Sequence, residues 1–530
     1  MQTDAFHVFD TTLRDGAQRE GISYSVADKL AVARLLDAVG VGFIEGGWPG
    51  AMPKDTEFFA RAADGELILK NAVLTAFGAT RRAGIAVEDD PQVQGLLDSR
   101  AAVVTLVAKS DVEHVRLALR TTLAENLAMV HDTVAYLRAH DRRVFVDCEH
   151  FFDGYRHDPA YGVAVLEAAR DAGADVGVLC DTNGGMLPLG VRDIVTDVRA
   201  RTPLRLGIHT QNDTGCAVAN TFAAVDAGAT HVQGTANGYG ERAGNADIFA
   251  VIGGLVTKMG LDVLPDGGLL ELSRVAHAIA EIANLAPDTH QAYVGTSAFA
   301  HKAGLHASAI KVSPELYNHL DPAVVGNRQR ILVTEMAGRA SVELKSGELG
   351  IDVSARPDVV GAVVNQIKER EADGWSYEAA DASFELLVRD ALGENTEQFT
   401  VESYRVIIDR TADGRLVSEA TVKVFAGGRR IICTEEGNGP VNALDRALRA
   451  ALGAVFPQLG RFSLSDYKVR ILSAHRPGTD AVTRVLVETS QLASATPTTW
   501  TTVGVHANVV EASWLALHDA VRYGLLHAAG

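Results

Sequence analysis

The stretch HVFDTTLRDG, residues 7–16, joins a short apolar run to a polar turn that contains a glycine. This combination recurs through the first half of the chain, with helical patterns in between. The alternation predicts successive βα units around a parallel sheet. After the first run, His7–Leu13, the others are Gly42–Glu45, Ala72–Phe77, Ala102–Val107, Arg143–Cys148, Val176–Cys180, Arg205–Ile208 and His231–Gly234. Eight such units favour an α/β fold of the (β/α)8 TIM-barrel type over an open sheet.

The helix expected after the first run has a clear start and end. Ser25 is placed to cap its N-terminus, and Asp28 stands three residues later, as in a capping box. Apolar residues at helical spacing follow, namely Val32, Leu35, Leu36 and Val39, and Gly40 ends the pattern.

The alternation is lost after about residue 261. Residues 262–374 have helical and loop patterns, including an expected helix at Leu269–Ala283, and predict a linker of small helices. From about Trp375, strands and glycine-containing turns return and predict a βββα unit that occurs twice. Its strands are expected at Val401–Ile408, Leu416–Phe425 and Arg429–Glu435, then at Tyr467–Leu472, Val482–Thr489 and Thr501–Val505, with helices from Val441 and around Val510–Val521.

These changes divide the chain into a barrel (residues 1–261), a helical linker (262–374) and a C-terminal α+β domain (375–530). No acid–base cluster stands out in the last of these, so binding or association is expected there rather than catalysis.

Composition and charge exclude several classes of protein. Apolar residues make up 47% of the 530 residues and charged residues 22%, as in folded soluble proteins. The net charge of -18, with no local cluster of Lys and Arg, argues against nucleic acid as a partner. The four cysteines lack a metal-binding spacing and are expected to be buried thiols in a reducing compartment. No apolar segment approaches the roughly 20 residues that span a bilayer, so we expect a cytoplasmic protein without a membrane partner.

Polar side chains follow the expected strands and would meet on one rim of the barrel. Asp15, His209, Gln211 and Asn245 come after the first, seventh and eighth strands. Taken singly, such residues are more often structural. Because they share a rim, they favour a site for one divalent ion.

Three motifs resemble one known family. FDTTLRDGAQ (residues 9–18) resembles the first-strand signature of the 2-isopropylmalate, homocitrate and citramalate synthases, and HTQND (209–213) and NGYGERAGN (237–245) are similar to its later metal signatures. The C-terminal repeat resembles the family's leucine- or isoleucine-sensing regulatory domain. EGGWPG (45–50) and CEHFFDG (148–154) look most like the citramalate-forming branch, which uses pyruvate.

The resemblance implies a metal-dependent acyltransferase that condenses acetyl-CoA with a small 2-oxo acid. With pyruvate, the product would be (R)-citramalate for isoleucine biosynthesis. It also implies feedback by isoleucine or leucine, and a homodimer whose subunits exchange linker segments.

The same resemblance implies roles for individual residues. Magnesium, manganese or zinc would be held by Asp15, His209, Gln211 and Asn245. Catalytic roles are implied for Arg14, Glu149, His306 and Tyr317, and substrate binding for Arg14, Gln18 and Thr182; Leu106 and Asp147 are candidate pocket residues.

Other readings of three of these residues stay open. Arg14 could instead form a structural ion pair with a neighbouring strand. Glu149 could orient metal ligands, and without the resemblance His306 would be a surface helix residue.

Gln211 departs from the family pattern, which has His-x-His where this chain has His209-Thr210-Gln211. An amide oxygen is a weaker donor to zinc and suits magnesium or manganese. Three outcomes are open: a working site with a changed metal preference, a weakened enzyme, or a paralogue that uses another 2-oxo acid.

Two competing classes are a lyase on the same barrel and a catalytically inactive amino-acid sensor. The long C-terminal repeat argues against the lyase. Retention of Arg14, Asp15, Glu149, His306 and Tyr317 argues against the sensor.

Overall fold

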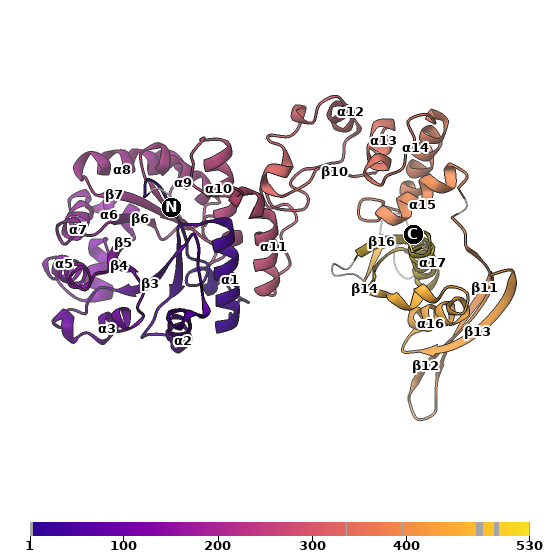
Figure 1. Cartoon of the computed structure of the whole chain (residues 1–530), viewed down its shortest axis with the longest axis horizontal. Helices are drawn as coiled ribbons and strands as arrows, with labels where there is room; N and C mark the ends of the chain where they lie inside the picture. The colour runs from indigo at the N-terminus through magenta and orange to yellow at the C-terminus, as the bar shows by residue number, and fades with distance from the viewer. Residues whose placement is uncertain (1–3, 335, 395, 473–480, 492–497, 529–530) are drawn as a thin grey trace. The chain divides into compact units, whose positions relative to one another are not determined.

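The computed structural model of the chain describes residues 4–334, 336–394, 396–472, 481–491 and 498–528. The chain forms two compact units (Figure 1). The first comprises Met1–Phe299 with Leu320–Arg328, and the second comprises Ala300–His319 with Gln329–Gly530. The three-part division with boundaries after residues 261 and 374 stays a prediction. Within the described residues, no helix is long and apolar enough to cross a bilayer.

The first unit contains a closed barrel of eight parallel strands, which confirms the predicted fold class. The strands pair in chain order, and β1 closes the barrel by pairing with β8. Their bounds are β1 His7–Asp10, β2 Phe43–Gly47, β3 Val73–Ala79, β4 Val103–Lys109, β5 Arg143–Glu149, β6 Val176–Asp181, β7 Arg205–Thr210 and β8 His231–Gly234.

The predicted runs and the strands differ mainly at their C-terminal ends. β4 and β5 continue past the apolar run because Lys109 and Glu149 still pair in register. β1 ends earlier than predicted, at Asp10, because the Asp10 carboxylate accepts hydrogen bonds from the backbone N–H and the hydroxyl of Thr12. These bonds turn the chain away from the strand.

Helices surround the barrel and bury its outer face (Figure 1). The first of them, α1, has the predicted capping box: the Ser25 hydroxyl accepts from the Asp28 N–H at 3.1 Å, and the Ser25 N–H donates to the Asp28 carboxylate at 2.8 Å. The helices are α1 Val26–Val39, α2 Pro53–Arg61, α3 Pro91–Asp98, α4 Val112–His114, α5 Leu123–Ala139, α6 Phe151–His157, α7 Pro159–Asp171, α8 Pro188–Arg201, α9 Ala217–Asp226, α10 Ile248–Thr257 and α11 Leu272–Ile282.

Aromatic rings fill the interior of the barrel. Phe9, Phe43 and Phe145 are buried there, and the Phe43 and Phe145 ring centroids lie 5.1 Å apart in an edge-on arrangement. Cys148 and Cys180 are buried as well, whereas Cys216 and Cys433 are only partly buried. The filled interior makes the barrel a packed core, so a ligand has room only at its mouth.

The second unit begins with short elements and ends with the predicted βββα repeat. Two antiparallel three-stranded sheets, β11–β12–β13 and β14–β15–β16, are each followed by a helix. Residues from both halves share one buried cluster, which includes Leu448 and Trp514.

The elements of the second unit have the following bounds: β9 Ala300–His301, α12 Gly304–Val312, β10 Arg330–Ile331, α13 Arg339–Glu348, α14 Pro357–Ala372, α15 Asp381–Ala391, β11 Phe399–Arg410, β12 Leu416–Ala426, β13 Arg429–Gly437, α16 Pro440–Gly453, β14 Phe462–Leu472, β15 Val482–Gln491, β16 Thr498–His506 and α17 Val509–His527.

Candidate active site

A cavity of about 780 Å³ opens at the C-terminal ends of the barrel strands. This is the end of a TIM barrel where the loops from separate strands converge. Seven of the predicted site residues line it: Arg14, Asp15, Gln18, Glu149, Thr182, His209 and Gln211. Residues predicted from separate stretches of the sequence therefore gather at one cavity.

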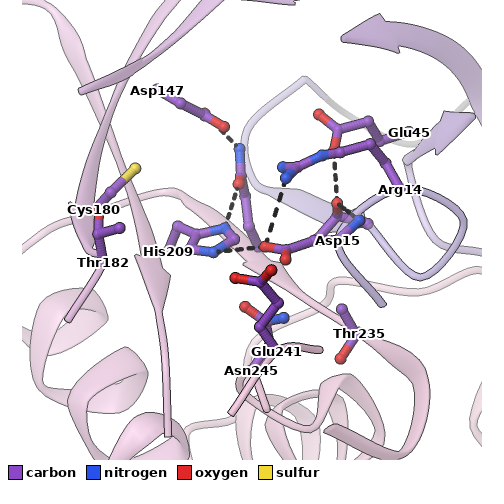
Figure 2. A network of polar contacts seen from close by, with 12 residues as sticks. Arg14, Asp15, Glu45, Asp147, Cys180, Thr182, His209, Thr235, Glu241 and Asn245 are labelled. Carbon is purple, nitrogen blue, oxygen red and sulfur yellow. Dashed lines mark hydrogen bonds and ion pairs between the residues drawn. The ribbon is translucent and has the colours of Figure 1, made fainter. Parts of the chain in front are cut away.

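Asp15 and His209 both line this cavity and point toward one another (Figure 2). Asp15 Oδ2 lies 3.2 Å from His209 Nε2, and both side chains are buried. Burial works to raise the pKa of Asp15, but the charge of Arg14 and the hydrogen bond from His209 hold it below its usual value. Two potential metal ligands from β7 and the first loop thus converge on one point.

Gln211 lines the same cavity, and Asn245 lies beside Asp15, whose pKa its side chain helps to lower. Their backbones form an isolated bridge, and the side-chain oxygens of both are buried without a hydrogen-bond partner. The Asn245 amide N–H donates instead to the Tyr239 carbonyl at 3.0 Å. Leaving a buried acceptor unsatisfied costs about 1–3 kcal/mol, so two such oxygens beside a carboxylate and an imidazole form a donor set that fits a divalent cation.

Among the described residues, no group of three or more His, Cys, Asp and Glu side chains is arranged to hold a metal. The four predicted ligands include only two residues of those types, Asp15 and His209, because Gln211 and Asn245 carry amides. Its oxygen-rich character suits magnesium or manganese better than zinc.

Arg14 lies beside the metal-ligand candidates and against the wall of the cavity. Its Nε donates to Glu45 Oε2 at 2.7 Å, its Nη1 lies 3.7 Å from Asp15 Oδ2, and its guanidinium stacks 3.9 Å from the centre of the Phe77 ring. The structural ion pair with a neighbouring strand therefore exists, since Glu45 belongs to β2. The same bond fixes the guanidinium at the cavity (Figure 2).

Glu149 ends β5 and forms an ion pair with Lys109 at the end of β4. Lys109 also lines the cavity, and the sequence analysis did not single it out. Its signal was present, because it follows an apolar run directly, as Glu149 does. Thr182 is held nearby, where its hydroxyl accepts a hydrogen bond of 2.8 Å from the His150 N–H.

The other predicted residues fall in different surroundings. Asp147 lines the cavity, whereas Leu106 is fully buried in the main core of the barrel unit. His306 and Tyr317 belong to the second unit, where their rings stack with centroids 4.1 Å apart. Their catalytic role stays a prediction.

Three family models match consecutive parts of the chain. HMGL-like matches residues 5–279, the homocitrate synthase post-HMGL domain-like model matches residues 293–374, and the LeuA allosteric (dimerisation) domain matches residues 378–525.

Full-length relatives are also similar to this chain. The (R)-citramalate synthase of Streptomyces coelicolor is 63% identical over 526 residues, covering 99% of this chain and 97% of the relative. The (R)-citramalate synthase of Synechocystis is 48% identical, covering 98% and 96%. A probable 2-isopropylmalate synthase of Methanopyrus kandleri is 32% identical, covering 91% and 92%.

Proposed function

We propose that this chain condenses acetyl-CoA with pyruvate to give (R)-citramalate and CoA. The premise is that it belongs to the (R)-citramalate synthase family, within the wider HMGL-like family. The observation that carries the proposal is the 63% identity to a citramalate synthase across 99% of the chain. The donor set at the barrel mouth supports the proposal, because this reaction needs an electrophilic keto group and a bound divalent ion would polarise it.

We assign the metal ligands to Asp15, His209, Gln211 and Asn245. A divalent ion bound there would polarise the keto group of the acceptor and stabilise the negative charge that develops on its oxygen. The two unpartnered amide oxygens support this assignment. They also support a preference for magnesium or manganese over zinc, which is the first of the three outcomes that Gln211 left open.

Arg14 supplies a second positive charge at the same place. Its Nε is occupied by Glu45, so its terminal nitrogens are the donors available to an oxygen of the acceptor. Burial against the Phe77 ring keeps water from weakening this interaction. Gln18 and Thr182 are the remaining candidates for binding the acceptor, since both line the cavity.

We assign proton movement to Glu149, His306 and Tyr317. Condensation requires loss of a proton from the methyl group of acetyl-CoA, and a histidine titrates in the range suited to that transfer. Tyr317 stacks on His306 and carries a hydroxyl that can donate to an oxyanion. Glu149, held as an ion pair by Lys109, carries a charge near the reacting centre.

The remaining parts of the proposal concern the second unit and the cell. We propose a regulatory role for the βββα repeat, with isoleucine or leucine as effector and isoleucine biosynthesis as the pathway. The match to an allosteric (dimerisation) domain supports a homodimer. We also keep the domain boundaries after residues 261 and 374, and a cytoplasmic location, as proposals.

The test is a screen of acceptors in which thiol release from acetyl-CoA is measured for pyruvate, 2-oxobutyrate, 2-oxoisovalerate and 2-oxoglutarate. Magnesium, manganese and zinc are each supplied in turn, and the product is identified by chiral chromatography. We expect the highest kcat/KM with pyruvate, (R)-citramalate as product, and better support from magnesium or manganese than from zinc. Activity confined to a branched acid would contradict the assignment, and no turnover in either the natural chain or Gln211→His would favour a sensor.

A further inference from the structure

One buried glutamine connects the candidate metal site to the interior of the barrel. Gln233 lies on β8, is 1% exposed, and was not among the predicted site residues. Its Oε1 lies 2.8 Å from His209 Nδ1, and its Nε2 lies 2.9 Å from Asp147 Oδ1 and 3.4 Å from His231 Nε2. All three partners are buried as well.

The chemistry of the partners fixes which way the amide of Gln233 points. The Nε2 donor of Gln233 faces Asp147 Oδ1. Burial raises the pKa of Asp147, whereas this hydrogen bond works to lower it, because the ionised carboxylate is the better acceptor. Burial, and then the neighbouring His7, lower the pKa of His231 well below its usual value, so its Nε2 can accept the second N–H. The carbonyl oxygen of Gln233 is therefore directed at His209.

This orientation in turn determines the protonation of the His209 ring. An amide oxygen only accepts, so His209 Nδ1 must carry a proton and donate it. The opposite nitrogen, Nε2, is the one directed at Asp15 and at the centre of the candidate metal site (Figure 2). A histidine that ligates a metal through one nitrogen usually donates its other N–H to such a partner.

We propose that Gln233 is a positioning residue of the metal site, which keeps the proton of His209 on Nδ1 and thereby presents the lone pair of Nε2 to the ion. The inference rests on the metal site of the proposed function and adds the residue that orients one of its ligands. Asp147 and His231 act one step further away, because they hold the Gln233 amide in the required orientation.

The test is calorimetric titration of Mn²⁺ into the metal-stripped full chain. Gln233→Met keeps the length of the side chain but removes the acceptor, whereas Gln233→Glu keeps an acceptor for His209. Burial raises the pKa of Asp147 to about 7, so a proton can be shared between the two carboxyl groups of that variant. Gln94→Met is the control, because it makes the same substitution and removes two hydrogen bonds away from the ligands, to the Glu88 carbonyl and the Tyr136 hydroxyl.

We expect Gln233→Met to weaken the Kd for Mn²⁺ by about 10–100-fold, and Gln233→Glu and Gln94→Met to stay within about threefold of the natural chain. An unchanged Kd in Gln233→Met would overturn the inference, as would a loss in Gln233→Glu equal to that in Gln233→Met. If Gln233→Met does not fold, the Gln233→Glu result decides alone: retained affinity supports the inference and lost affinity overturns it.

The measurements distinguish an error about Gln233 from an error about the metal site. If the natural chain turns over pyruvate with Mn²⁺ and Gln233→Met binds Mn²⁺ equally well, only the role of Gln233 is overturned. A natural chain that binds no Mn²⁺ overturns the metal site and the inference together.

Discussion

Replacing Gly240 by alanine should displace Asn245 from the metal site. Gly240 has φ +147, and a Cβ built on it would lie 2.3 Å from Asn245 Nδ2. Ordinary contact between such atoms needs about 3.5 Å, so the Asn245 amide would have to move by about 1 Å. That movement breaks its hydrogen bond to the Tyr239 carbonyl, now 3.0 Å.

The expected loss of activity in Gly240→Ala follows from the same displacement of Asn245. A displacement of about 1 Å at a reacting centre can cost about 100-fold in rate, so we expect kcat/KM for pyruvate to fall by about that factor. Backbone strain at this φ adds about 1–3 kcal/mol of lost stability. Steady-state assays of thiol release at saturating Mn²⁺, with thermal unfolding in parallel, separate the two effects.

Gly260→Ala is the matched control for this prediction. Gly260 also has a positive φ, +67, but a Cβ there meets nothing within 4 Å. It should lose some stability and keep its activity. Activity of Gly240→Ala equal to that of Gly260→Ala would refute the placement of Asn245 at the site.

Three further predictions concern other parts of the chain. Arg14→Lys should lower kcat about 100-fold while thermal stability changes little, because a lysine cannot both bond Glu45 and reach the acceptor; an unchanged kcat would count against the role of Arg14. Ser25→Ala removes the capping box of α1 and should cost about 1 kcal/mol in the free energy of unfolding, with full activity retained. Burial and the nearby Arg522 lower the pKa of His518 to about 4, whereas in the unfolded chain it is about 6.5. Between pH 7 and 5 the unfolded chain therefore binds a proton that the folded chain does not, and the free energy of unfolding should fall by about 2 kcal/mol. Hydrogen exchange in α17 should show this loss in the natural chain and not in His518→Gln.

The sequence predicted the barrel well because its signal is local and repeated. Each strand buries both faces in a parallel sheet, so a continuous apolar run marks it. The ends of the strands were less certain, since Lys109 and Glu149 extend β4 and β5 through pairing in register rather than through apolar character.

The metal-ligand candidates were predictable for a related reason. Asp15, His209 and Gln211 follow predicted apolar runs, although the observed β7 extends to Thr210 and includes His209. The fold brings the ends of these runs together at the cavity. Gln233 was missed because it lies inside the run His231–Gly234 that predicts the eighth strand, where a polar residue gives no loop signal. The pattern His231-Val232-Gln233 held a clue: residues two apart point to the same side of a strand, so these two polar side chains had to share the interior.

The roles of His306 and Tyr317 could not be derived from local pattern at all. His306 lies on the short helix α12 and Tyr317 in a turn of the same unit, where spacing carries no chemical signal. Their assignment depends on family resemblance alone.

A crystal of the full chain, grown with Mn²⁺ and pyruvate and measured at the manganese absorption edge, would show whether the four proposed metal ligands hold one ion. We expect one strong anomalous peak at the barrel mouth, about 2.0–2.3 Å from oxygen or nitrogen atoms of Asp15, His209, Gln211 and Asn245. The keto and carboxylate oxygens of pyruvate should complete the coordination. An ion bound elsewhere, or no peak among these side chains at saturating Mn²⁺, would contradict it.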